Sequence, residues 1–115
     1  MNEVFLEGTV ASMALVEYSA SAKQHCVCQL RVVHRNQKQQ TVSELYTINA
    51  WNRLAAWAAQ ALKSGMRVCV KGYLTQRTQQ SVVVTEVTAN RFVIQQATQP
   101  LPNAVPAQAS IPKTA

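Results

Sequence analysis

Hydrophobic and polar residues alternate with a period of two along most of the chain up to about residue 95. This period is typical of β-strands, whose successive side chains point to opposite faces of a sheet. The alternation is clearest in HCVCQLRVVHR, where Cys26, Cys28 and Leu30 share one face while Gln29 and Arg31 share the other. The pattern predicts five strands, at residues 3–12, 25–35, 42–51, 66–79 and 82–95.

One segment departs from this alternation. From residue 52 to 63 the composition changes to Ala and Leu, which have high helix propensity. Its apolar residues form a helical stripe that is expected to face the core, namely Leu54, Ala58, Ala61 and Leu62. Gly65 is placed to end the helix as a left-handed cap, and Gly72 to form a bulge that curves the next strand.

Five strands with one helix between the third and the fourth is the order of elements in an oligonucleotide-binding β-barrel, or OB fold. We therefore expect an all-β fold of this kind over residues 1–96, which are long enough for one core. From residue 97 onward the chain contains all four prolines and a single charged residue, Lys113. Residues 97–115 are therefore expected to form a flexible tail.

The charge balance favours an anionic partner. Eleven Lys and Arg stand against five Glu and no Asp, for a formal charge of +6. Nucleic acid is the partner that such a balance suggests, and a solvated basic surface is the alternative. Catalysis has little support, because the Glu residues are scattered and no Gly-rich phosphate loop is present. We expect neither an enzyme nor a cofactor.

The cysteines and the N-terminal segment bear on location. Three cysteines, an odd number, fit a reducing compartment with free thiols. The first 17 residues carry three Glu and no basic residue, which argues against a signal or transit peptide, and no apolar run approaches the ~20 residues that span a membrane. We expect a cytoplasmic protein. Cys26 and Cys28 with His25 make a poor metal ligand set without a second pair, so buried thiols are expected there and no metal.

Binding a single strand without reading its sequence requires flat rings for bases and cations for phosphates. Trp51 ends the third strand on its non-core face, so we expect it to stack on a base; packing under the helix or at a subunit contact is the alternative. On the fourth strand Tyr73 lies between Lys71 and Arg77 on one face, which predicts a second part of the same groove. The remaining candidate phosphate contacts, which are surface charges in the alternative, are Arg31, Arg35, Arg53, Lys23 and Lys38. Trp57 and Tyr46 are expected to pack in the core or at a subunit interface.

Three segments, NEVFLEGTV, AWNRLAAWAAQALKSGMRVCVKGYL and VVVTEVTANR, resemble successive parts of the bacterial and organellar single-stranded DNA-binding protein family. The resemblance covers about residues 2 to 95. It implies an OB barrel that binds and protects single-stranded DNA in replication, recombination or repair, as a homo-oligomer that is usually a tetramer. Trp51 falls on a stacking aromatic of the family. Leu45 and Gln79 stand where other members carry further aromatics, so this chain is expected to offer fewer stacking rings.

A shorter likeness points to an alternative. Cys28-Gln29 and His34-Arg35 are similar to dipeptides of primosomal replication protein N. That likeness implies a dimeric adaptor of replication restart, which acts mainly through protein contacts and binds single-stranded DNA more weakly. Replication or recombination proteins are expected as further partners. The closing IPKTA does not match the acidic, aromatic-tipped peptide with which the single-stranded DNA-binding family recruits such partners.

Overall fold

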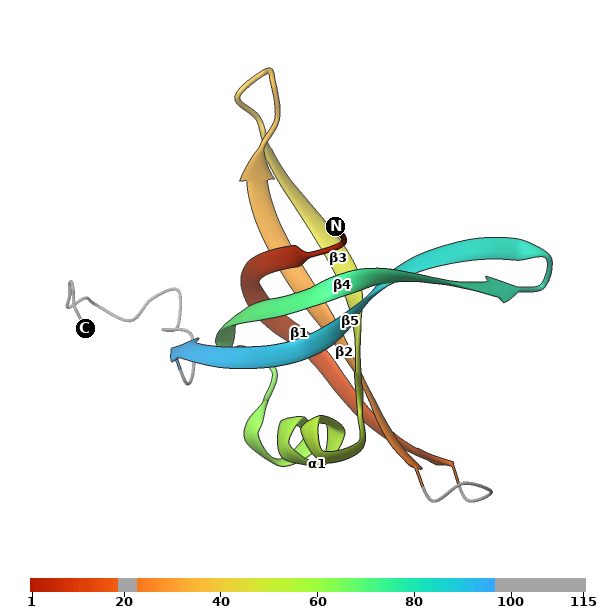
Figure 1. Ribbon diagram of the computed structural model, residues 1–115. Coiled ribbons are helices and arrows are strands. Elements are labelled where there is room, and N and C mark those ends of the chain that lie inside the picture. The colour runs from red at the N-terminus through yellow and green to blue at the C-terminus, as the bar shows by residue number, and fades with distance from the viewer. Residues whose placement is uncertain (19–22, 97–115) are drawn as a thin grey trace.

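The computed structural model describes residues 1–18 and 23–96, so the tail predicted at 97–115 lies outside the described residues. The described chain forms a closed five-stranded barrel with one helix (Figure 1). Its elements follow in the order β1 Val4–Tyr18, β2 Lys23–Arg35, β3 Thr41–Trp51, α1 Asn52–Ala61, β4 Arg67–Gln79 and β5 Val82–Gln96. The helix lies between β3 and β4, which confirms the predicted OB fold.

The strand order around the barrel is β1-β2-β3-β5-β4, closed by pairing of β1 with β4. All neighbouring strands are antiparallel except β3 and β5, which pair in parallel over Ile48↔Val87 and Asn49↔Thr88 alone. Beyond this short contact the β2–β3 and β4–β5 hairpins leave the barrel in different directions as two arms (Figure 1). The point where the arms diverge is where the candidate site lies.

The core is made of apolar side chains that point inward from all five strands and from α1. The largest fully buried side chains are Leu30, Ile48, Leu62, Val10, Val68, Val70, Cys26 and Cys28. Burial raises the pKa of Cys26, and burial together with the neighbouring Cys26 raises the pKa of Cys28 to about 12. Both therefore remain protonated thiols at neutral pH, and an inert packing role follows. Among the described residues no three His, Cys, Asp or Glu side chains come together as a metal site.

The helix is shorter than predicted because Leu62 already has an extended backbone, with φ −94° and ψ 133°. Its buried face consists of Ala55 and Ala58, followed by Leu62 just beyond the helix end. The prediction that Gly65 caps the helix is wrong. Gly65 does have a left-handed φ of 94°, but it lies in the turn to β4, where its N–H donates to the carbonyl of Val10 at 2.8 Å. In the part of the chain that the structure describes, no helix is long and apolar enough to cross a membrane.

Three irregularities of strand register bend the barrel. One of them, in the β4–β5 pair between Arg67 and Val68, skips Gln95 of β5. A second lies at the predicted Gly72, but its extra residue is on the partner strand. In the β4–β5 pair Lys71 faces Arg91 and Gly72 faces Ala89, so the extra residue is Asn90 of β5. Gly72 is needed for a different reason, since a Cβ there would lie 2.1 Å from the carbonyl oxygen of Thr88. Because the bulge is in β5, the side-chain alternation of β4 continues unbroken. The third irregularity, between Val10 and Ser12, lies inside β1, which runs to Tyr18 rather than ending near residue 12.

Candidate nucleic-acid interface

A groove of about 760 Å³ lies on the outer surface where the two arms diverge. Four strands contribute its lining. The lining residues are His25, Val27 and Gln29 of β2; Thr47, Asn49 and Trp51 of β3; Tyr73, Thr75, Gln76 and Arg77 of β4; and Glu86 and Thr88 of β5. Most of these side chains are uncharged hydrogen-bonding groups or aromatic rings, a lining suited to the edges and faces of bases.

Trp51 stacks on His25 at one end of this groove. The two residues are cross-strand partners in the β2–β3 pair, and their rings lie 4.0 Å apart between centroids with an interplanar angle of 7°. Trp51 keeps 39% of its surface exposed, whereas His25 keeps 9%. The indole therefore lies over a buried imidazole and remains open to solvent, on the non-core face where the sequence places it.

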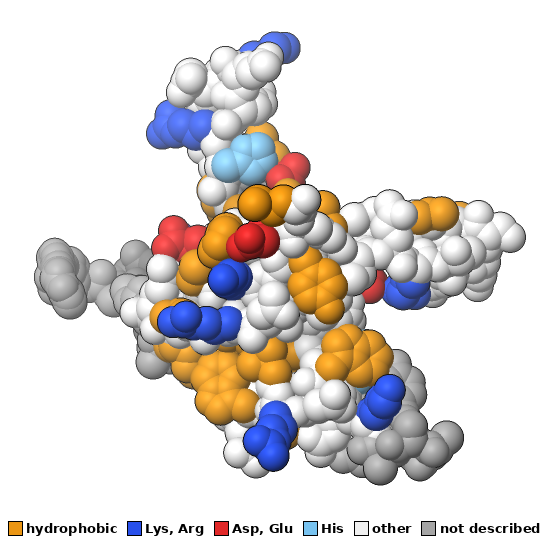
Figure 2. Space-filling model, viewed as in Figure 1, with side chains coloured by type: hydrophobic (Ala, Val, Ile, Leu, Met, Phe, Trp, Pro, Cys, Tyr) orange, Lys and Arg blue, Asp and Glu red, His pale blue; other side chains and the backbone are white. Residues whose placement is uncertain are grey.

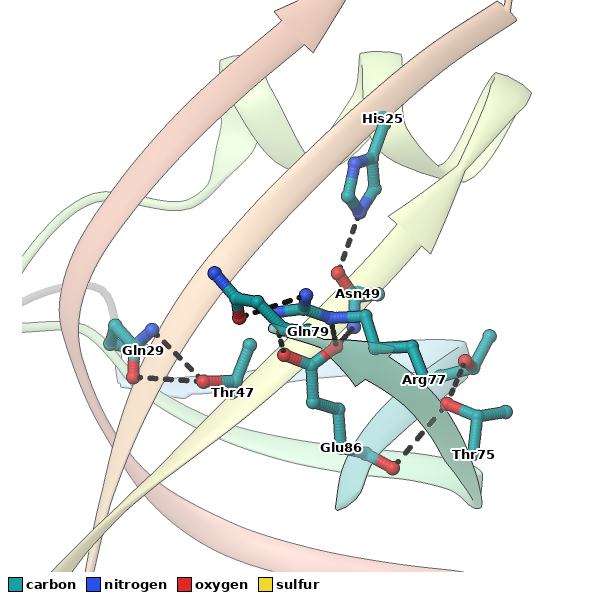
Figure 3. Close-up of polar contacts among 9 residues, drawn as sticks. His25, Gln29, Thr47, Asn49, Thr75, Arg77, Gln79 and Glu86 are labelled. Carbon is teal, nitrogen blue, oxygen red and sulfur yellow. Dashed lines mark hydrogen bonds and ion pairs between the residues drawn. The ribbon is translucent and has the colours of Figure 1, made fainter. Parts of the chain in front are cut away.

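A chain of hydrogen bonds continues below His25 (Figure 3). Its Nε2 lies 2.6 Å from Oδ1 of Asn49, and the Asn49 amide nitrogen donates to Glu86 at 2.8 Å. Since the amide nitrogen is used as this donor, Oδ1 is the acceptor and the Nε2 of His25 carries the proton. Arg77 donates to both Glu86 oxygens, from Nε at 3.1 Å and from Nη2 at 2.9 Å. Four strands are thereby joined through side chains.

Glu86 is the acid of this network, and its side chain is only 8% exposed. The hydrogen bonds from Arg77 are the largest influence and lower the pKa of Glu86, against the opposing effect of burial. The Asn49 hydrogen bond and electrostatic interactions with Arg77 and His25 lower this pKa further. Glu86 is therefore ionised at neutral pH. Its negative charge is balanced by the positive charge of Arg77, the kind of partner that a buried carboxylate requires.

The predicted β4 residues share one outer face, as expected from their spacing. Tyr73 lines the groove and is 37% exposed. Arg77 also lines it, but holds Glu86 and donates through Nη1 to Gln79. Lys71 is outside the lining, where its ammonium lies 5.8 Å from the ring centroid of Phe5, its cross-strand partner in β1. This distance is within the range of a cation–π contact.

The other predicted cations flank the groove rather than line it. Lys23, Arg31 and Arg35 are all exposed on the outer face of β2, the face that supplies His25 and Gln29 to the groove. Arg53 is exposed in the first turn of α1, two residues after Trp51, and Lys38 is exposed in the β2–β3 turn. Figure 2 shows Lys and Arg side chains distributed over this side of the molecule, including the β2–β3 arm, with exposed hydrophobic groups between them.

Trp57 and Tyr46 lie away from the groove lining. Trp57 is on α1, 41% exposed, with its ring 6.2 Å from that of Phe92. The expectation of a core position for Trp57 is therefore wrong, and the subunit-interface alternative stays a prediction. Tyr46 packs against the core, and its hydroxyl donates to Glu44 at 2.8 Å. Glu44 also accepts from His34, and Glu44 raises the pKa of Tyr46 through their hydrogen bond.

The prediction from sequence did not include three residues at the centre of the site, His25, Asn49 and Glu86. A signal for two of them was present. Asn49 shares the outer strand face of Trp51, and Glu86 is the one acid in the otherwise apolar and Thr-rich segment VVVTEVTA. Their meeting depends on the pairing of β3 with β5, which no local pattern encodes.

The model of the single-strand binding protein family matches residues 1–99. The chain belongs to this family. A solved structure with the same fold is a deletion mutant of the single-stranded DNA binding protein from Thermus aquaticus, with a TM-score of 0.68 and 18% identity. The match covers 84% of this chain and 51% of that one, so the chain spans about half the length of the Thermus protein. No curated protein is similar enough to the chain to be named as a relative.

Proposed function

We propose that this protein binds and protects single-stranded DNA without sequence specificity, in replication, recombination or repair. The observation that carries the proposal is the exposed Trp51 ring at a groove where two β-arms diverge, flanked by cations on the outer face of β2. Membership in the single-strand binding protein family supports it. The activity is assigned to residues 1–96 and is binding without catalysis.

In this proposal rings hold bases and cations hold phosphates. Trp51 stacks on one base and Tyr73 offers a second ring across the groove. Polar lining groups such as Gln29 and Thr47, which bond to each other at 3.1 Å, both donate and accept, so they do not favour one base. The cations proposed to contact phosphates around the groove are Lys23, Arg31, Arg35, Arg53, Lys38, Lys71 and Arg77.

The protein is proposed to act in the cytoplasm as a homo-oligomer, with a tetramer favoured over a dimer. Free thiols at Cys26, Cys28 and Cys69 fit a reducing compartment. Among the large side chains left exposed are Phe5, Val33, Val82 and Val83, each 58% exposed or more, which gives apolar surface for subunit contacts.

A primosome-type adaptor is the second candidate. It is favoured by the charge of the groove: Arg77 is the one Lys or Arg in the lining, and its positive charge is neutralised by Glu86. The lining itself therefore offers little net positive charge to phosphates. The adaptor is also favoured by the absence of rings at Leu45 and Gln79. An adaptor of this kind would form a dimer and would bind single-stranded DNA weakly.

One titration distinguishes the single-stranded DNA-binding function from the adaptor function. Tryptophan fluorescence is followed as poly(dT) is added to the full chain, with a duplex of equal length as the control and the mass measured by light scattering. We expect saturable quenching by poly(dT), much weaker binding of the duplex and a tetrameric mass. A dimer with weak binding would favour the adaptor, and equal affinity for duplex and single strand would contradict base stacking.

A further inference from the structure

His25 has no role in the proposed function, yet its ring is closely held at the end of the groove. Its imidazole lies parallel to the Trp51 indole at 4.0 Å, is only 9% exposed, and bonds to Asn49 through Nε2 at 2.6 Å. A ring so buried has little surface left for a direct contact with DNA. Any effect of His25 on binding is therefore expected to pass through Trp51.

The groups below the imidazole restrict its rotation. Turning the ring would separate Nε2 from Asn49, and moving Asn49 would remove a donor from the buried Glu86 carboxylate. Arg77 then holds Glu86 from β4 with two hydrogen bonds (Figure 3). Buried polar groups are costly to leave without partners, so each member of this network keeps the next in place.

We infer that His25 is a positioning residue for the stacking platform. Its ring packs on one face of the Trp51 indole and sets the indole plane, so that a base stacking on the solvent-exposed surface of the indole meets an ordered ring. The role requires a flat ring that also carries a hydrogen-bond donor, and the Nε2–H tautomer of histidine has both. A platform ordered before binding avoids the entropic cost of immobilising a free side chain.

This inference rests on the proposed function, and its test compares poly(dT) affinities of full-length variants at one salt concentration. His25→Ala should weaken binding about 2- to 10-fold, the range for losing the order of one side chain. Trp51→Ala should weaken it roughly 5- to 150-fold, the stacking range. Adding His25→Ala to Trp51→Ala should then change the affinity no further, because His25 acts only through the indole.

His34→Ala is the matched control. His34 is the other histidine of the chain and also bonds through Nε2, to Glu44 at 2.9 Å, but it is outside the groove lining. We expect its affinity to equal that of the wild type. An additive loss in the double variant, or wild-type binding by His25→Ala, would overturn the inference.

A second measurement needs no DNA. In a Trp57→Phe background Trp51 is the sole indole, and its fluorescence anisotropy and its quenching by acrylamide report its mobility. His25→Ala should lower the anisotropy and increase the quenching, whereas unchanged values would overturn the inference. If wild-type protein failed to bind poly(dT), the proposed function would fall, while this measurement would still decide whether His25 orders Trp51.

His25→Phe covers the case in which the alanine variant does not fold. Phenylalanine keeps a flat ring under the indole but lacks the donor to Asn49. We expect an affinity between those of the wild type and His25→Ala, with an indole more mobile than in the wild type. Wild-type affinity and wild-type anisotropy together would remove the Asn49 hydrogen bond from the positioning role.

Discussion

At the scale of single residues, the two indoles have nearly equal exposure but different surroundings. Trp51 and Trp57 are 39% and 41% exposed. Trp51 lies at the groove over a buried imidazole, while Trp57 lies on α1 against Phe92. The surroundings of the two rings therefore differ, and of the two only Trp51 lines the groove.

Trp51→Ala is expected to weaken poly(dT) binding by roughly 1–3 kcal/mol, the stacking contribution of one base, while the fold survives. Trp57→Ala is the control, with wild-type affinity and a loss of stability of about 0.5–1.5 kcal/mol from the aromatic pair in addition to lost apolar burial. Affinity is measured by electrophoretic mobility or anisotropy of labelled oligonucleotide, and stability by urea denaturation. Reversed phenotypes would move the binding site to α1.

At the scale of elements, β2 is the strand that links charge to the groove. Its outer face carries Lys23, Arg31 and Arg35 in addition to His25 and Gln29, so cations lie at both ends of the strand with the groove between them. A single strand lying along β2 would meet cations before and after the rings. This arrangement predicts a salt dependence that originates outside the groove lining.

Arg31→Ala should flatten the log–log dependence of affinity on salt by about 0.7, the value for one phosphate contact with a single strand. The loss should be alike on all sequences, because phosphate contacts carry no sequence information. Arg67→Ala is the control, since Arg67 lies at the start of β4 rather than on the outer face of β2, and its guanidinium is 3.6 Å from the Glu7 carboxylate of β1. Titrations at several salt concentrations check both slopes. Equal slopes for the wild type and Arg31→Ala would make Arg31 a solvated charge.

The β4–β5 pair depends on one close approach. Gly72→Ala would place a methyl group 2.1 Å from the Thr88 carbonyl oxygen, so the strands would have to separate at a cost of roughly 1–3 kcal/mol or more. Gly65→Ala has open space around it and should lose only about 1–2 kcal/mol, from its left-handed backbone. Urea denaturation of both variants checks which one loses more stability. A Gly72→Ala variant more stable than Gly65→Ala would contradict this account of the β4–β5 pair.

At the scale of the whole molecule, one polar network joins the two arms. It extends from His25 in β2 through Asn49 in β3 and Glu86 in β5 to Arg77 in β4. Because its acid is buried and ionised, the network also makes the stability of the barrel depend on pH.

The pKa of Glu86 is lowered in the folded protein, chiefly by Arg77, so its contribution to stability is present above the unfolded value of 4.5 and is lost as the pH falls through the lower folded value. Glu86→Gln should lose about 1–3 kcal/mol at pH 7, where a charged hydrogen-bond acceptor is removed. It should also lose less stability than the wild type as the pH falls below the unfolded value of 4.5. Urea denaturation at these pH values checks the slope, with the exposed Glu3→Gln as the control. Parallel curves for Glu86→Gln and the wild type would exclude Glu86 as the acid-sensitive group.

The sequence by itself determined the elements and the faces that they present. A period of two placed the five strands, Ala and Leu placed the helix between the third and fourth, and the same alternation placed Trp51 and Arg31 on outer faces. These properties are local, because backbone geometry and side-chain polarity act over a few neighbouring residues. The stacking ring and its flanking cations could therefore be proposed from local patterns alone.

Only the tertiary structure decided what lies beside what. His25 contacts Trp51 although the two are 26 residues apart in the sequence, and Asn49 contacts Glu86 although they are 37 residues apart. The barrel also contains three irregularities of strand register, which skip Ala11 in β1 and Asn90 and Gln95 in β5. Such bulges arise where closing a twisted sheet into a barrel requires one strand to be longer than its partner. That requirement belongs to the closed barrel and not to any short segment. The His25–Trp51 and Arg77–Glu86 contacts each lie within one hairpin, whereas the Asn49–Glu86 hydrogen bond that joins them needs β3 to meet β5 in the closed barrel.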